Sequence, residues 1–436
     1  MPKPVKEQKV LHDQVKEKEE LVVDGMDLSG HWNRMFGQMV IWDYSHENLA
    51  RVSELPGGES LEWCYSCGKC TAVCPVDIVG DYSPRKIHRK TQIGVDLFTS
   101  DDLWLCTTCM NCLRVCPKEV DMIQIMPAVR EQTVLAGNVP DELQKAFEDT
   151  ANYGNPLGKP QRKRAAWTKQ SEVPVPILAE IEGPVDVLWY VGSYPSYHPR
   201  GIDASLAAAR ILHALEVDFG ILGKEEKDDG DSQRLAGETG LFEMLAEHNI
   251  EVFSQYEWQT VVVMGPHEFN AFKNEYPRYG FERPILHYTQ FLVQHLDQLK
   301  PLLRHRVEAQ VTFHDPCYLG RHNGEYDAPR ELLRVIPGLE LVEMGRCREN
   351  GYCCGGGGGA MWLDSFTTNH TIMRLSERRV LEAVEYGADI LAVACPFEVS
   401  RFEDGAKNTG NEQLQVRDIL ELLDQSMNGN MGSASL

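Results

Sequence analysis

The chain has 436 residues, of which 42% are hydrophobic and 25% charged, and its formal net charge is -22. This length predicts two or three globular domains, and the negative charge argues against nucleic acid and anionic membrane surfaces as partners. The polar opening predicts no signal peptide, and no apolar run approaches the roughly 20 residues of a membrane span. We therefore expect a cytoplasmic protein without a transmembrane segment, which reaches the inner face of a membrane only through partners.

The pattern along the chain predicts an α-helical part followed by an α/β part. Residues 1–60 are polar and predicted to be mostly helical, with a charged helix around Val5–Val23. A stretch rich in Pro, Gly and basic residues, 155–174, predicts an exposed linker. Beyond it, short apolar runs alternate with helical patterns, which predicts a mainly parallel sheet. The predicted segments are 1–60, 61–150, 151–184 (linker), 185–300, 301–425 and a disordered tail over 426–436.

Thirteen cysteines are the most informative feature of the composition. Disulfide scaffolds are typically small and secreted, and this chain is neither, so we expect the thiols to bind metal in a reducing compartment. Eight of them form two motifs with the spacing of bacterial two-cluster ferredoxins, C-x2-C-x2-C-x3-C-P. The motif residues are Cys64, Cys67, Cys70 and Cys74, and then Cys106, Cys109, Cys112 and Cys116.

In this spacing the first three thiolates bind one cluster and the fourth, held by the Cys-Pro turn, reaches the other cluster. Zinc is the rival metal, but it usually takes two C-x2-C pairs. Between the motifs, Ser83-Pro84 predicts the start of a helix and Gly94 its end, which favours an α-helical ferredoxin domain over 61–150. The predicted ligand sets are Cys64, Cys67, Cys70 and Cys116 for one [4Fe–4S] cluster, and Cys106, Cys109, Cys112 and Cys74 for the other.

The α/β part contains an internal repeat. The run VVVMGPHE over 261–268 aligns with LAVACPFE over 391–398, and two earlier positions align at matching distances. The second copy carries thiols at four of the five corresponding positions and the first copy carries none, so only the second can bind a soft metal. The corresponding positions are Ser193 and Cys317, Asp228-Asp229-Gly230 and Cys353-Cys354-Gly355, Gly265 and Cys395, and Glu268 and Glu398.

Five consecutive glycines, 355–359, follow the paired thiols Cys353-Cys354. Glycine loses more conformational freedom on folding than any other residue, so such a run needs a physical reason. We expect a bulky prosthetic group to lie against this backbone and leave no room for side chains. The third predicted site consists of Cys317, Cys353, Cys354 and Cys395.

The motifs resemble the heterodisulfide reductase family. The runs CYSCGKCTAVCP and LWLCTTCMNCLRVCP are similar to its HdrC subunit, whereas HDPCYLGRHNGEYDAPRELL, RENGYCCGGGGG and ACPFE are similar to its HdrB subunit and to the C-terminal part of HdrD. Fused relatives of this type include DsrK and TmcB, and the iron–sulfur subunits of glycolate and anaerobic glycerol-phosphate dehydrogenases are similar too. The resemblance implies a cysteine-rich (CCG-type) fold for each repeat, and a non-cubane iron–sulfur cluster in each complete unit, two of which cleave a disulfide between them.

This sequence departs from the family pattern in both units. The first unit has no thiols at the family positions, so we expect it to be a structural half without a cluster. The second has Glu398 where the family's last cysteine belongs, and Cys347, upstream of it, is a free thiol, a substitute ligand or a redox-active thiol beside the cluster. Three alternatives remain open, namely a ligand role for Glu398, a ligand role for Cys347, and an ordinary cubane cluster on four thiolates.

The resemblance implies an iron–sulfur electron-transfer subunit of an oxidoreductase. Electrons would pass through two [4Fe–4S] clusters to a third iron–sulfur site, non-cubane or [4Fe–4S], where Cys317, Cys353, Cys354 and Cys395 support reduction of a disulfide or oxidation of a dithiol. The expected partners are a flavoprotein or a membrane cytochrome or quinone subunit, and a thiol cofactor or a small thiol protein. The alternative is a non-catalytic relay between a dehydrogenase (2-hydroxy acid, glycerol-phosphate or acyl-CoA type) and a membrane quinone partner.

The remaining motifs are weaker. Fourteen histidines form no H-E-x-x-H pattern, and His314 is expected to orient its loop by hydrogen bonding. No G-x-G-x-x-G run follows a predicted strand, which argues against a flavin or nicotinamide on this chain.

Overall fold

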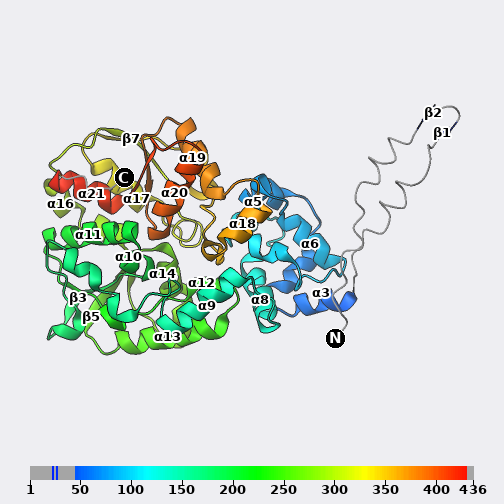
Figure 1. Cartoon of the computed structure of the whole chain (residues 1–436), viewed down its shortest axis with the longest axis horizontal. Helices are drawn as coiled ribbons and strands as arrows, with labels where there is room; N and C mark the ends of the chain where they lie inside the picture. Colours follow the sequence, from blue (N-terminus) through cyan, green and yellow to red (C-terminus); the bar gives the residue numbers. More distant parts are fainter. Residues whose placement is uncertain (1–21, 24–25, 28–44, 430–436) are drawn as a thin grey trace.

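A computed structural model describes residues 22–23, 26–27 and 45–429 of the chain. Figure 1 shows a helical domain, coloured blue to cyan, beside a larger body of helices and strands coloured green to red. Near the start, β1 (Val22–Val23) pairs antiparallel with β2 (Met26–Asp27). The predicted opening helix lies outside the described residues except at Val22–Val23, where the prediction was wrong because these residues form a strand.

The helical domain encloses the eight clustered cysteines. Helix α6 has Ser83 as its N-cap and Pro84 as its first residue, as predicted, because proline fits the first turn and lacks the donor that would be left unpaired there. Its elements are α3 (His46–Ser53), η1 (Gly58–Trp63), α4 (Lys69–Val73), α5 (Pro75–Val79), α6 (Pro84–Gln92), η2 (Asp101–Leu105), α7 (Asn111–Val115), α8 (Met122–Leu135) and α9 (Asp141–Tyr153).

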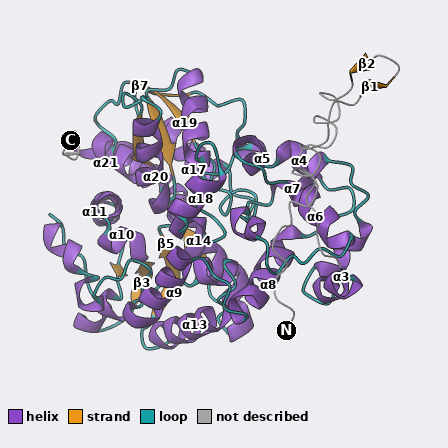
Figure 2. Cartoon of the chain, turned by 45° about the vertical axis from the view of Figure 1, so that its right-hand side comes forward, coloured by secondary structure: helices purple, strands orange, loops and turns teal. Residues whose placement is uncertain are grey.

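The α/β body contains two four-stranded parallel sheets, drawn in orange in Figure 2. In chain order the first sheet has β3 (Val185–Tyr190), β4 (Phe219–Gly220), β5 (Trp258–Val263) and β6 (Ile285–His287), and the second has β7 (Ala309–Phe313), β8 (Leu339–Leu341), β9 (Ile390–Val393) and β10 (Gln415–Asp418). The spatial orders are β4-β3-β5-β6 and β10-β9-β7-β8. The two sheets therefore share one arrangement. The second strand lies beside the first, the third strand lies on the other side of the first, and the fourth lies beyond the third.

Helices and short helical turns connect the strands of each sheet. We call residues 185–302 the first half and residues 309–428 the second half. The first half contains α10 (Ser193–Tyr197), α11 (Pro199–Ala214), η6 (Gly223–Glu225), α12 (Asp231–Leu235), α13 (Thr239–Phe253), α14 (Pro266–Asn270), the π-helical turn η7 (Ala271–Glu275), η8 (Tyr276–Tyr279), α15 (Tyr288–Gln294), α16 (Leu296–Leu299) and η9 (Lys300–Leu302). The second contains α17 (Asp327–Val335), η10 (Arg348–Asn350), η11 (Ala360–Trp362), α18 (Asp364–His370), α19 (Leu375–Glu385), α20 (Pro396–Asn408) and α21 (Ile419–Asn428).

One apolar core runs through both halves. It includes Val187 and Val262 of the first sheet and Phe313 and Ile390 of the second, all nearly inaccessible to solvent. A second core belongs to the helical domain but extends to Cys353 of the second half. Because apolar burial is the dominant favourable term in folding, this shared core fixes the helical domain against the α/β body.

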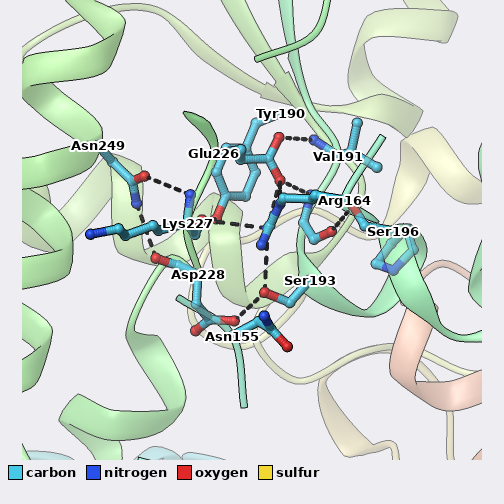
Figure 3. A network of polar contacts seen from close by, with 12 residues as sticks. Asn155, Arg164, Tyr190, Val191, Ser193, Ser196, Glu226, Lys227, Asp228 and Asn249 are labelled. Atoms are coloured by element: carbon cyan, nitrogen blue, oxygen red, sulfur yellow. Dashed lines mark hydrogen bonds and ion pairs between the residues drawn. The ribbon is translucent and has the colours of Figure 1, made fainter. Parts of the chain in front are cut away.

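The predicted linker is not an exposed connection. It contains η3 (Gln161–Lys163), η4 (Ala166–Gln170) and η5 (Leu178–Glu180), and both Arg164 and Trp167 are buried. Arg164 Nη2 lies 2.7 Å from Glu226 Oε1, in the network of Figure 3. The prediction of an exposed linker was wrong because Glu226, which is distant in sequence, neutralises Arg164 and allows this basic residue to be buried.

The predicted tail begins later than expected. Ser426 through Asn428 complete α21, and Ser426 is fully buried, whereas residues 430–436 lie outside the described part of the chain. Within the residues that the structure describes, every helix is too short or too polar to cross a bilayer.

Candidate functional site

The first cysteine set consists of Cys64, Cys67, Cys70 and Cys116, and all four line one cavity of the helical domain. Burial and the nearby sulfurs of Cys64, Cys116 and Cys67 raise the pKa of Cys70 above its ordinary value. Cys70 is buried and Cys67 is exposed. The structure thus brings together the four residues that the crossed ferredoxin spacing assigns to one cluster.

The second cysteine set gathers around Tyr82, which is buried beside Cys106, Cys74 and Cys112. Burial, with a smaller contribution from Cys106, raises the pKa of Cys74 to about 12. Burial and the sulfurs of Cys106 and Cys74 also raise the pKa of Cys112. Cys109, the fourth predicted member, lies at the border with the third site. The position of Tyr82 beside these cysteines could not be predicted from the sequence, because a tyrosine between the two motifs belongs to no recognisable spacing pattern.

The two cysteine loops share an unusual backbone. Ser66 and Thr108, each one residue before the second cysteine of its motif, have φ of 59° and 50°, and Gly68 and Met110, one residue after it, have φ of 83° and 69°. Non-glycine residues in this left-handed region cost on the order of 1–3 kcal/mol and occur mainly at functional sites. The same strained turn in both loops indicates that it serves to direct the three cysteines of each motif to one point.

The third site has Cys353 at its centre. Cys353 is fully buried, and hydrogen bonds from Cys109, Cys317 and Cys354 hold its pKa well below the ordinary value. Through Cys109 the third site therefore adjoins the second cysteine set directly. Since all thirteen cysteines are free thiols, each of these sulfurs is available to a metal.

Part of the glycine run packs closely against the second ferredoxin loop. A side chain on Gly357 would come within 2.5 Å of the Thr107 carbonyl oxygen, and one on Gly358 within 2.5 Å of the Cys106 carbonyl oxygen. Arg130, which is fully buried, donates to the carbonyls of Gly358 and Cys106 at 2.9 and 2.6 Å. At these two positions the close neighbour is the second ferredoxin loop itself, whereas Gly356 lines the cavity beside the third site, where a bulky group stays a prediction.

A cavity beside the third site lies between the two halves of the α/β body. Cys317, Cys354 and Cys395 line it from the second half, and His267 lines it from the first half. Its other walls combine apolar and polar side chains, namely Pro266, Pro316, Tyr318, Met361 and Phe397 with Ser232, Glu398 and Arg401. Three predicted site residues thus reach one enclosed space, and Cys353 lies behind them.

His267 is the main site residue that the sequence did not reveal. Its Nδ1 lies 2.7 Å from Asp231 Oδ2, and its ring packs on Tyr318 with 4.3 Å between centroids. Burial lowers the pKa of His267, but the hydrogen bond and charge of Asp231 outweigh burial and place the pKa above its ordinary value. The only available signal was the position of His267 in the repeat, one residue before Glu268.

The two candidate substitute ligands lie in different places. Ligand atoms of His314, Cys354 and Glu398 all lie within 4.8 Å of one another, and Glu398 Oε2 has no hydrogen-bond partner among the described residues although it is buried. A buried carboxylate oxygen without a partner is costly and fits a metal ligand. Cys347, by contrast, is half-buried beside Glu343, where burial raises its pKa.

His314 differs from its predicted role only in part. Its Nδ1 accepts a hydrogen bond from Arg379 at 3.2 Å, as expected of a residue that orients its loop, while its Nε2 lies 3.2 Å from Glu398 Oε1. His314 thus belongs to the same group as the candidate ligand.

The paired acids Asp228 and Asp229 of the first half are occupied by protein partners, whereas the buried Glu268 Oε2 has no hydrogen-bond partner among the described residues. Asp228 accepts from Ser193 Oγ at 2.6 Å and from the amide of Gly230 at 3.1 Å, and Asp229 accepts from the amide of Asp231 at 2.8 Å. Among the described residues, His314, Cys354 and Glu398 form a group whose ligand atoms lie close enough together to hold a metal ion. Asp228 and Asp229 belong to no such group in the described part of the chain.

Two arginines, the buried Arg321 and the half-buried Arg401, were also absent from the sequence predictions. Arg321 donates to the carbonyl of Cys109 at 2.6 Å, and Arg401 donates to the carbonyls of Cys354 and Gly355 at 3.0 and 2.9 Å. Both bring positive charge to the border between the cysteine loops. This charge offsets the negative charge that thiolate ligands carry.

Comparison with known proteins gives two family matches. Residues 60–120 match the 4Fe-4S dicluster domain, and residues 311–397 match the cysteine-rich domain. The chain therefore carries iron–sulfur clusters in its helical part and a cysteine-rich domain at its third site.

Similar proteins include several oxidoreductases. The chain is 37% identical over 355 residues to the probable iron-sulfur-binding oxidoreductase FadF of Bacillus subtilis, a match that covers 80% of this chain and 49% of that protein. It is 33% identical over 339 residues to the EtfAB:quinone oxidoreductase of Syntrophomonas wolfei, covering 76% of this chain and 47% of that protein. The chain thus spans about half the length of these two relatives.

A third relative matches over almost its whole length. The HdrD subunit of the dihydromethanophenazine:CoB–CoM heterodisulfide reductase of Methanosarcina barkeri is 32% identical over 398 residues, which cover 84% of this chain and 94% of that protein. Together with the two family matches, this agreement confirms the resemblance in the cysteine motifs and an electron-transfer role. The chain belongs to the HdrD family of iron–sulfur oxidoreductases, which is named after this heterodisulfide reductase component.

Proposed function

We propose that the chain holds two [4Fe–4S] clusters and a third iron–sulfur site. The proximity of the thiols supports this count, because the cysteines form three groups. The strained loops and the low pKa of Cys353 also suit thiolate ligation. The proposed ligands are Cys64, Cys67, Cys70 and Cys116 for the first cluster, Cys106, Cys109, Cys112 and Cys74 for the second, and Cys317, Cys353, Cys354 and Cys395 with Glu398 for the third site.

The two halves are repeats of one cysteine-rich unit, and the first has lost its metal site. Both sheets have the same strand order, and the glycines after the paired positions, Gly230 and Gly355, have nearly equal φ of 82° and 85°. Gly265 and Cys395 are each the N-cap of the helix after the third strand. The proposed domains are a ferredoxin domain over 61–150 and repeats over 185–300 and 301–425, joined by the packed segment 151–184.

The third site reduces a disulfide or oxidises a dithiol. The observation that carries this proposal is the cavity, where Cys317, Cys354 and Cys395 reach a space lined by apolar side chains. Iron–sulfur clusters supply single electrons when bound, and each disulfide that is cleaved takes up two electrons and two protons to give two thiols. The apolar side chains of the cavity limit the access of water, and His267 lies where it can give a proton to a sulfur in the cavity.

Electrons reach the third site from outside the chain through the ferredoxin domain. The contact between Cys109 and Cys353 supports this order, because it joins the second cysteine set to the third site. The partner that supplies or accepts them is a flavoprotein or a membrane cytochrome or quinone subunit, and the substrate is a thiol cofactor or a small thiol protein. The protein would then lie at the inner face of the membrane through this partner.

A second candidate function is a relay without disulfide chemistry, between a dehydrogenase and a quinone partner. One observation favours it, namely that the first half presents Asp228, Asp229 and Glu268 where a second thiol-bound cluster would face the cavity. A mechanism that needs two such clusters is therefore closed to this chain. The similarity to a protein named EtfAB:quinone oxidoreductase supports the same alternative.

A spectroscopic titration separates the two functions. Under anaerobic conditions, a dithiol or a disulfide such as cystine is added to the holoprotein while the visible and EPR spectra are recorded. The disulfide function predicts a change in the signal of the third site that is absent in the Cys353→Ser, Cys354→Ser double variant. A third-site signal that dithionite reduces but neither compound changes would leave the relay as the function.

A further inference from the structure

A basic groove lies on helix α6 of this strongly acidic chain. The segment over 83–94, SPRKIHRKTQIG, contains no acidic residue, and its basic side chains line a groove together with Ser66, Asp81, Ile93 and Asp102. We call Arg85, Lys86, Arg89 and Lys90 with these neighbours the α6 groove. A positive surface on a chain of net charge -22 calls for a specific explanation, since the average field of the molecule is negative.

The two acids of the α6 groove neutralise only part of its charge. Lys86 pairs with Asp81, and Lys90 Nζ lies 2.7 Å from Asp102 Oδ2. Arg85 and Arg89 are exposed and have no ion-pair partner among the described residues. The groove therefore keeps an excess of positive charge, carried by these two arginines.

The α6 groove continues into the first cysteine set. Ser66 and Arg85 line both the groove and the cavity that contains Cys64, Cys67, Cys70 and Cys116. Exposed Lys69 and Lys118 line the cavity as well. The basic surface thus runs from the far end of α6 to the edge of the first cluster site.

The same edge exposes aromatic side chains. Tyr65 and Trp63 are 60% and 54% exposed, and Cys67, two residues after Tyr65, is exposed too. Exposed aromatic anchors with a charged rim are typical of protein interfaces. By contrast, Cys109 and Cys353 are buried, and Cys67 is the one exposed cysteine of the three sites, so the first site has a ligand residue at the protein surface.

The basic residues of the α6 groove are not all explained as compensation for the negative charge of the cluster's thiolate ligands. Arg85, Lys69 and Lys118 are close enough to the first cysteine set to serve that purpose. Lys86 and Arg89 line the groove alone and do not line the cysteine cavity. An extended basic stripe beside a cluster instead suits attraction and orientation of an oppositely charged surface.

We propose that the α6 groove, with Tyr65 and Trp63, is the docking surface for an acidic, one-electron carrier protein. This proposal rests on the proposed function, since it assigns the first cluster as the place where electrons cross. One electron passes between the carrier and the cluster, so that one is oxidised and the other reduced. No bond forms or breaks, and no proton moves.

The test uses the anaerobic holoprotein and a chemically reduced plant-type [2Fe–2S] ferredoxin as the acidic carrier. The test variant is Arg85→Glu, Arg89→Glu. The control variant, Lys300→Glu, Arg304→Glu, makes the same change of net charge at exposed residues of η9 and the loop after it, which follow α16 at the opposite end of the molecule in Figure 1. Iron content and dithionite reduction of each variant show whether the clusters are intact.

Stopped-flow mixing gives the second-order rate constant of electron transfer at several salt concentrations. Because electrostatic steering raises association rates by about 10–1,000-fold, we expect the test variant to lose at least about 10-fold at low salt, and the loss to shrink at high salt. The control variant should keep the native rate. Equal rates in both variants, while dithionite still reduces all clusters, would overturn the docking proposal and leave the proposed function intact.

Two further measurements exclude other roles of the groove. If the midpoint potential of the first cluster falls enough in the test variant to explain the slower rate, the arginines tune the cluster, and the docking proposal is wrong. If the native protein co-sediments with phosphatidylserine vesicles, the test variant does not, and ferredoxin rates are unchanged, the surface binds a membrane instead. A holoprotein whose clusters dithionite fails to reduce would contradict the proposed function itself.

Discussion

The thiol of Cys109, in the second ferredoxin motif, lies beside the thiol of Cys353, at the centre of the third site, and their interaction raises the pKa of Cys109 and lowers that of Cys353. Each residue also belongs to its own group of thiols. The contact therefore places two proposed metal sites against one another, with the glycine run and the second ferredoxin loop forming the rest of the border. Electron transfer between the ferredoxin domain and the third site needs no further group between them.

Gly357→Ala should disturb this border. A methyl group there would meet the Thr107 carbonyl oxygen at 2.5 Å, so the glycine run must move away from the second loop. Overpacking of this kind costs about 1–3 kcal/mol. We expect lower stability in denaturant unfolding and a weaker magnetic interaction between the second and third sites by EPR. Gly240→Ala is the control, because nothing lies within 4 Å of that position, and it should leave both quantities near their native values.

Arg164→Ala should destabilise the protein far more than Arg162→Ala, although both residues lie in the segment 151–184. Arg164 is buried against Glu226, which also accepts from the amides of Val191 and Gly192 at 3.0 and 2.9 Å (Figure 3). Removal of one partner of a buried pair leaves an uncompensated charge and costs about 3–5 kcal/mol.

Arg162 is exposed, so its replacement should change the free energy of unfolding by no more than about 0.5 kcal/mol. Denaturant unfolding of the anaerobic holoprotein measures both variants. Equal stability of the two would mean that the segment is a linker after all.

Asp231→Asn should shift the pH dependence of disulfide reduction. The proton-donating form of His267 is the charged imidazolium, which is lost as pH rises through its pKa, and Asp231 holds this pKa above the ordinary 6.5. Without the carboxylate, burial dominates and the pKa falls, so the rate should begin to decline at lower pH. His267→Gln should abolish this decline, whereas exposed His213→Gln should not alter it. An unchanged pH profile in the Asp231 variant would exclude His267 as the donor.

Glu398→Gln should change the EPR spectrum or midpoint potential of the third site, because Glu398 lies within 4.8 Å of Cys354 and His314. An amide is a weaker donor to iron than a carboxylate, so the ligand field changes even if the iron stays. Cys347→Ser should leave iron content and spectrum unaltered, since Cys347 contacts Glu343 instead. The reverse pair of results would identify Cys347 as the ligand.

Features that depend on local spacing could be predicted from the sequence. The ferredoxin motifs and the helix start at Ser83-Pro84 are read from residues a few positions apart, because loop geometry fixes which thiols converge. The alternation of apolar runs and helices likewise predicts parallel strands such as β3 and β5, since a strand buried on both faces must be apolar throughout.

Features that depend on partners far apart in the chain could not be predicted from the sequence. The pair of Arg164 and Glu226 joins residues 62 positions apart, and His267 and Asp231 are 36 apart. Gly357 of the glycine run meets Thr107, far earlier in the chain. In each case only the fold shows what the residue contacts.

Iron analysis of the native protein and of the Cys353→Ser, Cys354→Ser variant, both prepared anaerobically, tests the central claim most directly. With four iron atoms in each of two clusters and a similar number at the third site, the native chain should bind about twelve, and the variant about eight. Its two ferredoxin clusters should keep their spectra, because their ligands lie in a separate domain. A native chain that binds only about eight iron atoms, or a variant that loses none, would contradict the third redox site and the function built on it.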